Sequence, residues 1–126
     1  MARVTGIGGI FLRARDPEAL GAWYARNLGV PYADGFAKMV WSVDTDPEAC
    51  TVWAPFDEAT SHFGPSPQQA MVNFRVDDLD GLLSDLAAAG VEVIPERSED
   101  VTGRFAWIVD CEGNRVELWE PPRRRL

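Results

Sequence analysis

The sequence is poor in residues that build metal clusters and disulfide frameworks. Its 126 residues include one histidine, His62, and two cysteines, Cys50 and Cys111. Two cysteines are too few for a disulfide framework or a cysteine-based metal cluster. No apolar run approaches the roughly 20 residues that cross a bilayer, so we expect no membrane partner. The start of the chain shows no apolar signal core, and we expect a cytoplasmic protein.

Basic side chains are also in deficit. The chain has 20 acidic and 12 basic side chains, which gives a formal net charge of −8. A field of that sign repels phosphate backbones, so nucleic acid is not an expected partner. The same field attracts cationic small molecules.

An internal repeat organises what is present. Residues 10–16 and 72–78 both alternate apolar and polar side chains, which is the period of a half-buried strand. Each stretch ends at an aspartate, Asp16 or Asp78, that is a good N-cap for the helical pattern that follows. In the first of these helices Leu20, Trp23, Tyr24 and Leu28 recur at helical spacing, and Trp23 and Tyr24 are predicted to be core residues.

Short strand-like runs separated by turn residues follow each predicted helix. They are 30–33, 36–43 and 49–54 in the first half, and 91–94, 104–109 and 115–119 in the second, with a loop near 95–103. The halves end alike, because Val52-Trp53-Ala54-Pro55 mirrors Leu118-Trp119-Glu120-Pro121. We therefore treat Trp53 as the repeat partner of Trp119.

The pattern predicts an α+β fold made of two strand–helix–strand–strand–strand (βαβββ) modules. The modules are residues 4–55 and 70–121, joined by a linker at 56–69, within one domain of residues 1–126. Neither module alone would bury much apolar surface. We expect the two to share one curved, cup-shaped mixed sheet with the helices outside.

The closing segment carries a family resemblance. The stretch Asp110-Cys111-Glu112-Gly113-Asn114 and the Glu-bearing strand after it are similar to the closing hairpin of the glyoxalase/bleomycin-resistance/extradiol-dioxygenase family, with Cys111 in place of the usual proline. The opening strand and helix, Gly6 to Val30, resemble that family too. The resemblance covers nearly the whole chain and implies the glyoxalase-like (vicinal oxygen chelate) fold, which hosts many unrelated functions.

The resemblance also implies a divalent metal held by four side chains. The two places on opening strands fall on Gly9 and Met71, and the two on closing strands fall on Thr51 and Glu117. Only Glu117 is a competent ligand for a hard metal. His62 lies in the linker, and one histidine cannot rebuild the set. We expect neither a metal nor another cofactor.

Strand alternation predicts which side chains line the cup. They are Phe11, Arg13, Met71, Asn73, Arg75, Arg115, Glu117 and Trp119, with Trp53 added as the repeat partner of Trp119 and with Trp41 and Trp107 added from middle strands. Flat aromatic rings with few polar groups suit an organic ligand. The alternative for each tryptophan is a place in the core or at a dimer interface.

Glu117 is the candidate catalytic residue. It is a possible general base, or an anion that pairs with a cationic ligand. The alternative is a structural carboxylate that forms a salt bridge with Arg13, Arg75 or Arg115, because a buried carboxylate needs a partner. Arg13 and Arg75 occupy equivalent places in the repeat, where they could clamp an anion or simply form a solvated strand face.

Two functions follow from this pattern. The first is a metal-free small-molecule-binding protein, similar to the bleomycin-binding members of the family, which sequester a cationic or aromatic compound in a groove between paired subunits. The second is a glyoxalase-type lyase, isomerase or dioxygenase with a non-standard or metal-independent site at Glu117. In both we expect a symmetric homodimer.

Overall fold

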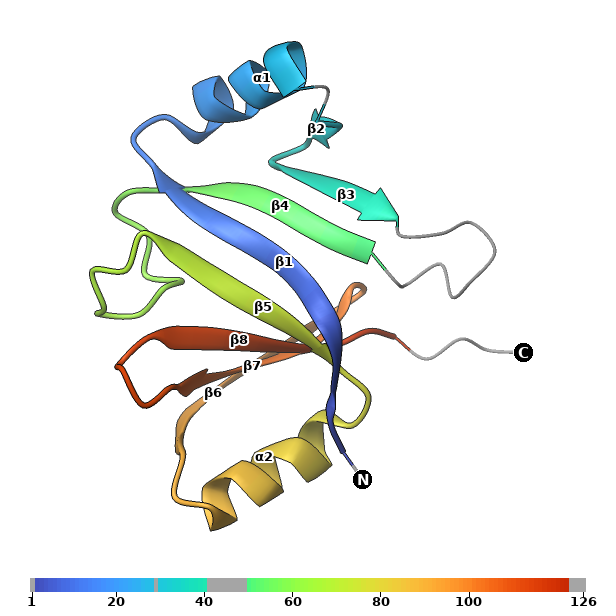
Figure 1. Ribbon diagram of the computed structural model, residues 1–126, viewed down its shortest axis with the longest axis vertical. Helices are drawn as coiled ribbons and strands as arrows, with labels where there is room; N and C mark the ends of the chain where they lie inside the picture. Colours follow the sequence, from blue (N-terminus) through green and yellow to red (C-terminus); the bar gives the residue numbers. More distant parts are fainter. Residues whose placement is uncertain (1, 29, 41–49, 123–126) are drawn as a thin grey trace.

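The structure, a computed structural model, describes residues 2–28, 30–40 and 50–122. In this part of the chain eight strands form one mixed sheet, with two helices packed outside it (Figure 1). The first half comprises β1 (Val4–Ala14), α1 (Pro17–Leu28), β2 (Tyr32–Ala33), β3 (Phe36–Val40) and β4 (Cys50–Asp57). The second comprises β5 (Ala70–Val76), α2 (Leu79–Ala88), β6 (Glu92–Asp100), β7 (Gly103–Val109) and β8 (Arg115–Glu120). The predicted fold class is confirmed.

The two halves meet along the central strands of the sheet. The strand order is β2-β3-β4-β1-β5-β8-β7-β6, with β1 and β5 antiparallel at the centre. Each central strand runs parallel to the closing strand of its own half, β4 or β8. The helices lie at opposite ends of the molecule (Figure 1), which leaves one curved face of the sheet free of helices. We call it the concave face.

The two aspartates predicted as N-caps do cap the helices. The Asp16 carboxylate accepts a hydrogen bond from the Ala19 amide at 3.0 Å, and the Asp78 carboxylate accepts one from the Gly81 amide at 3.0 Å. Such caps satisfy amide groups that the first turn of a helix leaves without partners.

Among the described residues, no helix is both long and apolar enough to cross a membrane.

Helix α2 covers an apolar layer on the outer side of the second half. Val76, Leu79, Leu83, Ala106 and Leu118 form this buried cluster. They come from β5, α2, β7 and β8, where alternate strand residues point to the same side. This layer fixes the orientation of β8. The residues of β8 that alternate with Leu118 therefore face the concave side.

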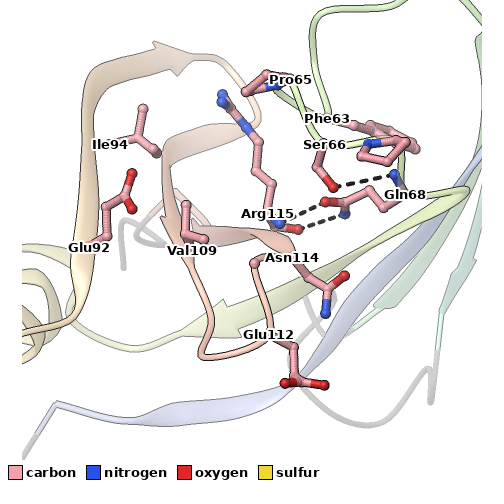
Figure 2. Close-up of a pocket in the computed structure, with 12 residues that line it drawn as sticks. Phe63, Pro65, Ser66, Gln68, Glu92, Ile94, Val109, Glu112, Asn114 and Arg115 are labelled. Atoms are coloured by element: carbon pink, nitrogen blue, oxygen red, sulfur yellow. Dashed lines mark hydrogen bonds between the residues drawn. The ribbon is translucent and has the colours of Figure 1, made fainter.

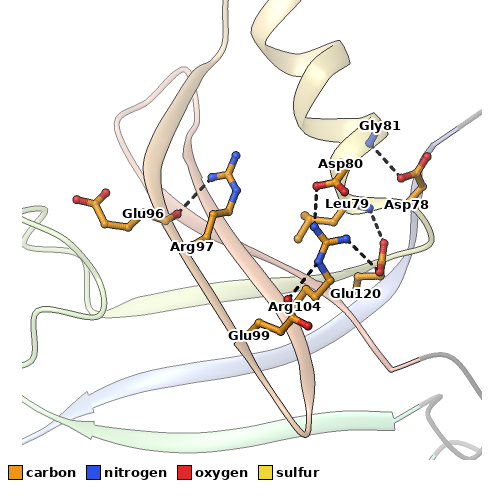
Figure 3. A network of polar contacts seen from close by, with 9 residues as sticks. All are labelled: Asp78, Leu79, Asp80, Gly81, Glu96, Arg97, Glu99, Arg104 and Glu120. Carbon is orange, nitrogen blue, oxygen red and sulfur yellow. Dashed lines mark hydrogen bonds and ion pairs between the residues drawn. The ribbon is translucent and has the colours of Figure 1, made fainter.

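An arginine ties the start of α2 to the sheet beneath it (Figure 3). The guanidinium of Arg104 lies 2.7 Å from the Asp80 carboxylate and 3.6 Å from that of Glu120. Glu120 also accepts a hydrogen bond of 2.8 Å from the Leu79 amide at the first turn of the helix. The hydrogen bond from Arg104 lowers the pKa of Asp80 below its ordinary value.

The loop predicted near residues 95–103 is wrong. β6 continues to Asp100 and pairs with β7 across a tight turn. The pairing register shifts between Val93 and Arg97, which places Pro95 at an irregularity where no ladder hydrogen bond is needed. The strand is polar because it is an exposed edge, and that composition made it resemble a loop.

The segment between β4 and β5, residues 58–69, packs onto the concave face. Phe63 from this segment has no exposed surface and packs with Phe11, Met71 and Trp107. Arg13 on β1 holds the segment in place, because its guanidinium donates hydrogen bonds to three backbone carbonyls, those of Glu58, Ser66 and Gln68, at 2.8–3.0 Å. We call residues 58–69 the covering segment.

Candidate functional site

The most unusual group on the concave face is a buried carboxylate. Glu117 on β8 is 2% exposed. Its Oε2 accepts a hydrogen bond of 2.6 Å from the side-chain amide of Asn73, and its Oε1 accepts one of 3.0 Å from the indole of Trp107. The imidazole Nε2 of His62 lies 2.8 Å from the same Oε1. A buried carboxylate is tolerated when its oxygens are satisfied in this way.

The sheet itself brings three members of this network together. Asn73 lies beside Glu117 in the parallel pairing of β5 with β8, and Trp107 lies opposite Glu117 in the antiparallel pairing of β7 with β8. Residues in register on neighbouring strands point to the same face. The backbone pairing therefore aims two donors at one carboxylate.

A glycine makes room for Asn73. The register between β1 and β5 shifts between Ile7 and Gly9, so Gly8 lies at a bulge. A Cβ on Gly8 would overlap the side-chain oxygen of Asn73. Any larger residue at position 8 would displace the amide that holds Glu117.

The fourth member, His62, comes from the covering segment. Its ring stacks on Phe56 with a centroid distance of 4.8 Å and an interplanar angle of 8°, and it meets the edge of Trp107 at 5.7 Å. The His62 side chain is 30% exposed, whereas that of Glu117 is 2% exposed. Of the two, His62 is the group that a bound molecule can reach.

The structure corrects the predicted partner of Glu117. The structural alternative gave it an arginine, Arg13, Arg75 or Arg115, but the basic side chain at the carboxylate is His62. Sequence reasoning set His62 aside because it lies in a polar connecting segment. The available signal was its neighbour Phe63, an apolar residue in that polar stretch, which marks a point where the segment is anchored.

Several other predicted site residues share the concave face but differ in exposure and contacts. Phe11 is 7% exposed, with its ring 5.3 Å from Phe56 and 6.1 Å from His62. Met71 has no exposed surface and is a core residue. Arg75 is partly buried and lies beside Trp119 in the pairing of β5 with β8.

Trp119 lies on the same face, beside the turn between β6 and β7. It is 7% exposed, and its indole donates a 2.7 Å hydrogen bond to the carbonyl of Thr102 in the turn between β6 and β7. The ring therefore joins β8 to the tip of that hairpin. Trp41 lies outside the described residues.

The sheet register shows how the two halves correspond. Phe11 lies opposite Met71 and Gly9 lies opposite Asn73 in the antiparallel pairing of β1 with β5. The helices that follow these strands begin at Pro17 and Leu79, which places the local twofold axis at the Ile10–Val72 pair and makes it exchange the two pairs. It makes Gly9 equivalent to Met71, as predicted, and Phe11 equivalent to Asn73.

The closing strands do not correspond as predicted. Asn73 lies beside Glu117, and its equivalent Phe11 lies beside Ala54. Ala54, not Thr51, is therefore the first-half counterpart of Glu117, and the predicted alignment of the closing strands is wrong by three residues. An odd shift moves every side chain to the other face of a strand.

Trp53 shows the consequence of that shift. It lies on the helix side of the sheet, with its ring 4.4 Å from Tyr24 and 6.3 Å from Tyr32. It is not the counterpart of Trp119 and does not line the concave face. Tyr24 packs as predicted, but Trp23 is 47% exposed and is not a core residue.

Comparison with known proteins identifies the class. Residues 6–118 match the profile of the Glyoxalase/Bleomycin resistance protein/Dioxygenase superfamily. The chain belongs to this superfamily, as the resemblance predicted. A search of curated proteins finds no significant match.

Solved structures share the fold at low sequence identity. A methylmalonyl-CoA epimerase variant from Streptomyces coelicolor superimposes with a TM-score of 0.75 at 17% identity, covering 96% of this chain and 100% of that one. The methylmalonyl-CoA epimerase from Mycobacterium tuberculosis gives 0.66 at 21% identity, covering 95% and 90%. An NAD-dependent benzaldehyde dehydrogenase structure from Legionella pneumophila gives 0.61 at 12% identity, covering 90% and 98%. These likenesses show the fold.

The residues at the family's metal places do not fit a divalent ion. With the corrected register the four places hold Gly9, Ala54, Met71 and Glu117, which offer one hard ligand. Both oxygens of Glu117 already accept hydrogen bonds, from Asn73 at Oε2 and from Trp107 at Oε1. Within residues 2–28, 30–40 and 50–122, no three His, Cys, Asp or Glu side chains gather in a way that could hold a metal.

Proposed function

We propose that the chain is a metal-independent small-molecule-binding protein in which His62 is the polar group that contacts the ligand. The observation that carries this proposal is the 2.8 Å contact between His62 Nε2 and the buried Glu117 carboxylate. Glu117 is enclosed and its oxygens are occupied, so it acts by orienting His62. The ligand then meets a partly exposed imidazole.

The surroundings of His62 indicate the kind of ligand. The ring contacts Phe11, Phe56 and Trp107, so its immediate surroundings are apolar and aromatic. A site of this composition favours an organic molecule with a flat or apolar part and one hydrogen-bonding group. A cation paired directly with Glu117 is disfavoured, because that carboxylate already has donors at both oxygens.

A thermal-shift screen of antibiotics, aromatic metabolites and thiol conjugates tests this proposal. A ligand at a hundredfold its dissociation constant stabilises the protein by about 2.7 kcal/mol. We expect His62→Ala to remove the stabilisation by a hit, and Ser61→Ala, the matched change at the neighbouring exposed residue, to retain it. Hits that stabilise both variants equally would refute a role for His62.

A second candidate is proton transfer by the same pair. Among the described residues, only Nε2 of the His62 ring is held by a hydrogen-bonding partner, which leaves Nδ1 to accept or give a proton. Methylmalonyl-CoA epimerases share this fold, so methylmalonyl-CoA is a suitable carbon acid to try. Incorporation of solvent deuterium that persists without metal and is lost in His62→Ala would favour an enzyme over a binding protein.

We also propose that the chain forms a homodimer. Phe36 and Val40 on β3 are 43% and 48% exposed, next to an outer strand, β2, of only two residues. Exposed apolar side chains near a sheet edge are typical of interfaces. Light scattering should give the mass of two chains at micromolar concentration. A monomer throughout that range would refute pairing.

A further inference from the structure

A cleft separate from His62 lies between the covering segment and the second half of the sheet (Figure 2). Its volume is about 670 Å³, within the range of small-molecule sites. Phe63 and Pro65 form one wall, while Ile94 on β6 and Val109 on β7 form the other. Neither His62 nor any other member of the Glu117 network lines it. We call it the Arg115 cleft, after the cation that enters it.

Arg115 is fixed at its backbone. Its amide donates a 2.7 Å hydrogen bond to the side-chain oxygen of Gln68, and its carbonyl accepts a 2.9 Å hydrogen bond from the Gln68 amide. Gln68 in turn donates to the carbonyl of Ala70 at 2.9 Å. The start of β8 is therefore held rigidly against the covering segment.

The side chain of Arg115 is also held in place. Its guanidinium carbon lies 5.1 Å from the centre of the Trp107 ring, which is a cation–π contact. On another side it approaches Gly64, where an added Cβ would lie 3.0 Å from Nη1. The side chain extends toward the end of the cleft lined by Ile94 and Pro65 (Figure 2).

The guanidinium has no acceptor in the described part of the chain. Its Nε is buried without a hydrogen-bond partner, and the described residues form no ion pair with it. Arg13 and Arg104 differ, because carbonyls or carboxylates satisfy their guanidinium groups. An outside group does not reach the enclosed Nε, but the terminal nitrogens also lack an acceptor among the described residues, and an anion that enters the cleft can supply one.

We propose that the Arg115 cleft binds a carboxylate carried on a small apolar body. The carboxylate meets the terminal nitrogens of Arg115, because planar guanidinium and carboxylate groups match each other in geometry. The apolar body lies against Pro65, Ile94 and Val109.

The cleft favours a monoanion over a phosphate. Glu92 and Glu112 also line it, and the whole chain carries a formal charge of −8. Repulsion from these groups grows with the charge of the ligand, so a dianion is penalised more than a monoanion. A single carboxylate retains the contact with Arg115 at the lower repulsion.

The test titrates the protein with three probes: 3-phenylpropionate, the neutral 3-phenylpropanamide and phenyl phosphate. Binding is followed by NMR through the backbone and side-chain amide signals of the protein. We expect 3-phenylpropionate to cause saturable shifts at residues 112–115 and at the side-chain amide of Gln68. The neutral amide should bind at least about tenfold more weakly, as expected for loss of a charged hydrogen bond. Phenyl phosphate should also bind more weakly than the carboxylate. Equal binding of carboxylate and amide would overturn the proposal, and tighter binding of phenyl phosphate would overturn its assignment to a carboxylate.

Variants locate the effect. Arg115→Gln should weaken 3-phenylpropionate binding about tenfold or more, whereas Arg26→Gln removes the same charge from α1 outside the cleft and should leave binding unchanged. If Arg115→Gln does not fold, Glu92→Gln supplies an independent test, because Glu92 is exposed and its loss should tighten binding. Glu96→Gln is the matched control on the same strand. Unchanged binding in both cleft variants would overturn the proposal and would not affect the role of His62.

Discussion

His62 and Glu117 form the central contact of the concave face, with Nε2 and Oε1 2.8 Å apart. The histidine comes from the covering segment and the glutamate from β8, so the contact joins a connection to the sheet. Because Glu117 also accepts hydrogen bonds from Asn73 and Trp107, the position of the carboxylate does not depend on the imidazole alone. The pair stands where the superfamily would place a metal ligand in the second half of the sheet.

A double-mutant cycle measures this contact. We expect His62→Ala and Glu117→Gln to be non-additive, with a coupling of about 1.5–3 kcal/mol in the free energy of unfolding, as for a hydrogen bond to a charged group. Urea unfolding of the four proteins gives this value. Ser61→Ala combined with Glu117→Gln is the control and should be additive. Additivity of the His62 cycle within about 0.5 kcal/mol would mean that the contact contributes nothing specific.

Tryptophan fluorescence tests which rings border the ligand. Trp107 touches both His62 and Glu117, whereas Trp53 packs against Tyr24 on the other side of the sheet. A ligand that depends on His62 should quench fluorescence in the wild type and in Trp53→Phe. The response should be lost in Trp107→Phe. Quenching that disappears with Trp53 instead would place the ligand on the helix side.

The fold was predictable from the sequence because its signals are local. Strand alternation and the capping aspartates Asp16 and Asp78 act over a few residues, and they appear twice in the same order. The network at Glu117 depends on long-range contacts. His62 is brought there by the burial of Phe63 and by the hydrogen bonds of Arg13 to the covering segment. Local periodicity carries no information on such contacts.

The placement of Trp53 was missed for a related reason. Matching Trp-x-Pro endings suggested one alignment of the closing strands, but the backbone pairing of β1 with β4 requires another. A three-residue difference is small along the sequence and still reverses the face. The register of a strand is decided by its partner strand, which the sequence motif does not show.

The ion pair between Arg104 and Asp80 gives a pH dependence whose sign can be stated. Its hydrogen bond lowers the pKa of Asp80 in the folded protein, so the pair stabilises above the unfolded pKa of about 3.9 and is lost as the pH falls through the lower folded value. Asp80→Asn should therefore have a lower Tm than wild type at pH 7, and the gap should close toward pH 3. Asp85→Asn on the same helix is the control. A gap that stays constant between pH 7 and pH 3 would contradict this assignment.

The metal content of the purified protein tests the central claim most directly. Glu117 alone at the family's four places leaves a divalent ion with one ligand that is already hydrogen-bonded, and a catalytic site generally needs three or more. Elemental analysis after incubation with Ni²⁺, Mn²⁺ or Fe²⁺ and desalting should find far less than one metal ion per chain, with no difference between wild type and Glu117→Ala. One tightly bound metal ion per chain that is lost in Glu117→Ala would contradict the account and make a metal-dependent enzyme the better explanation.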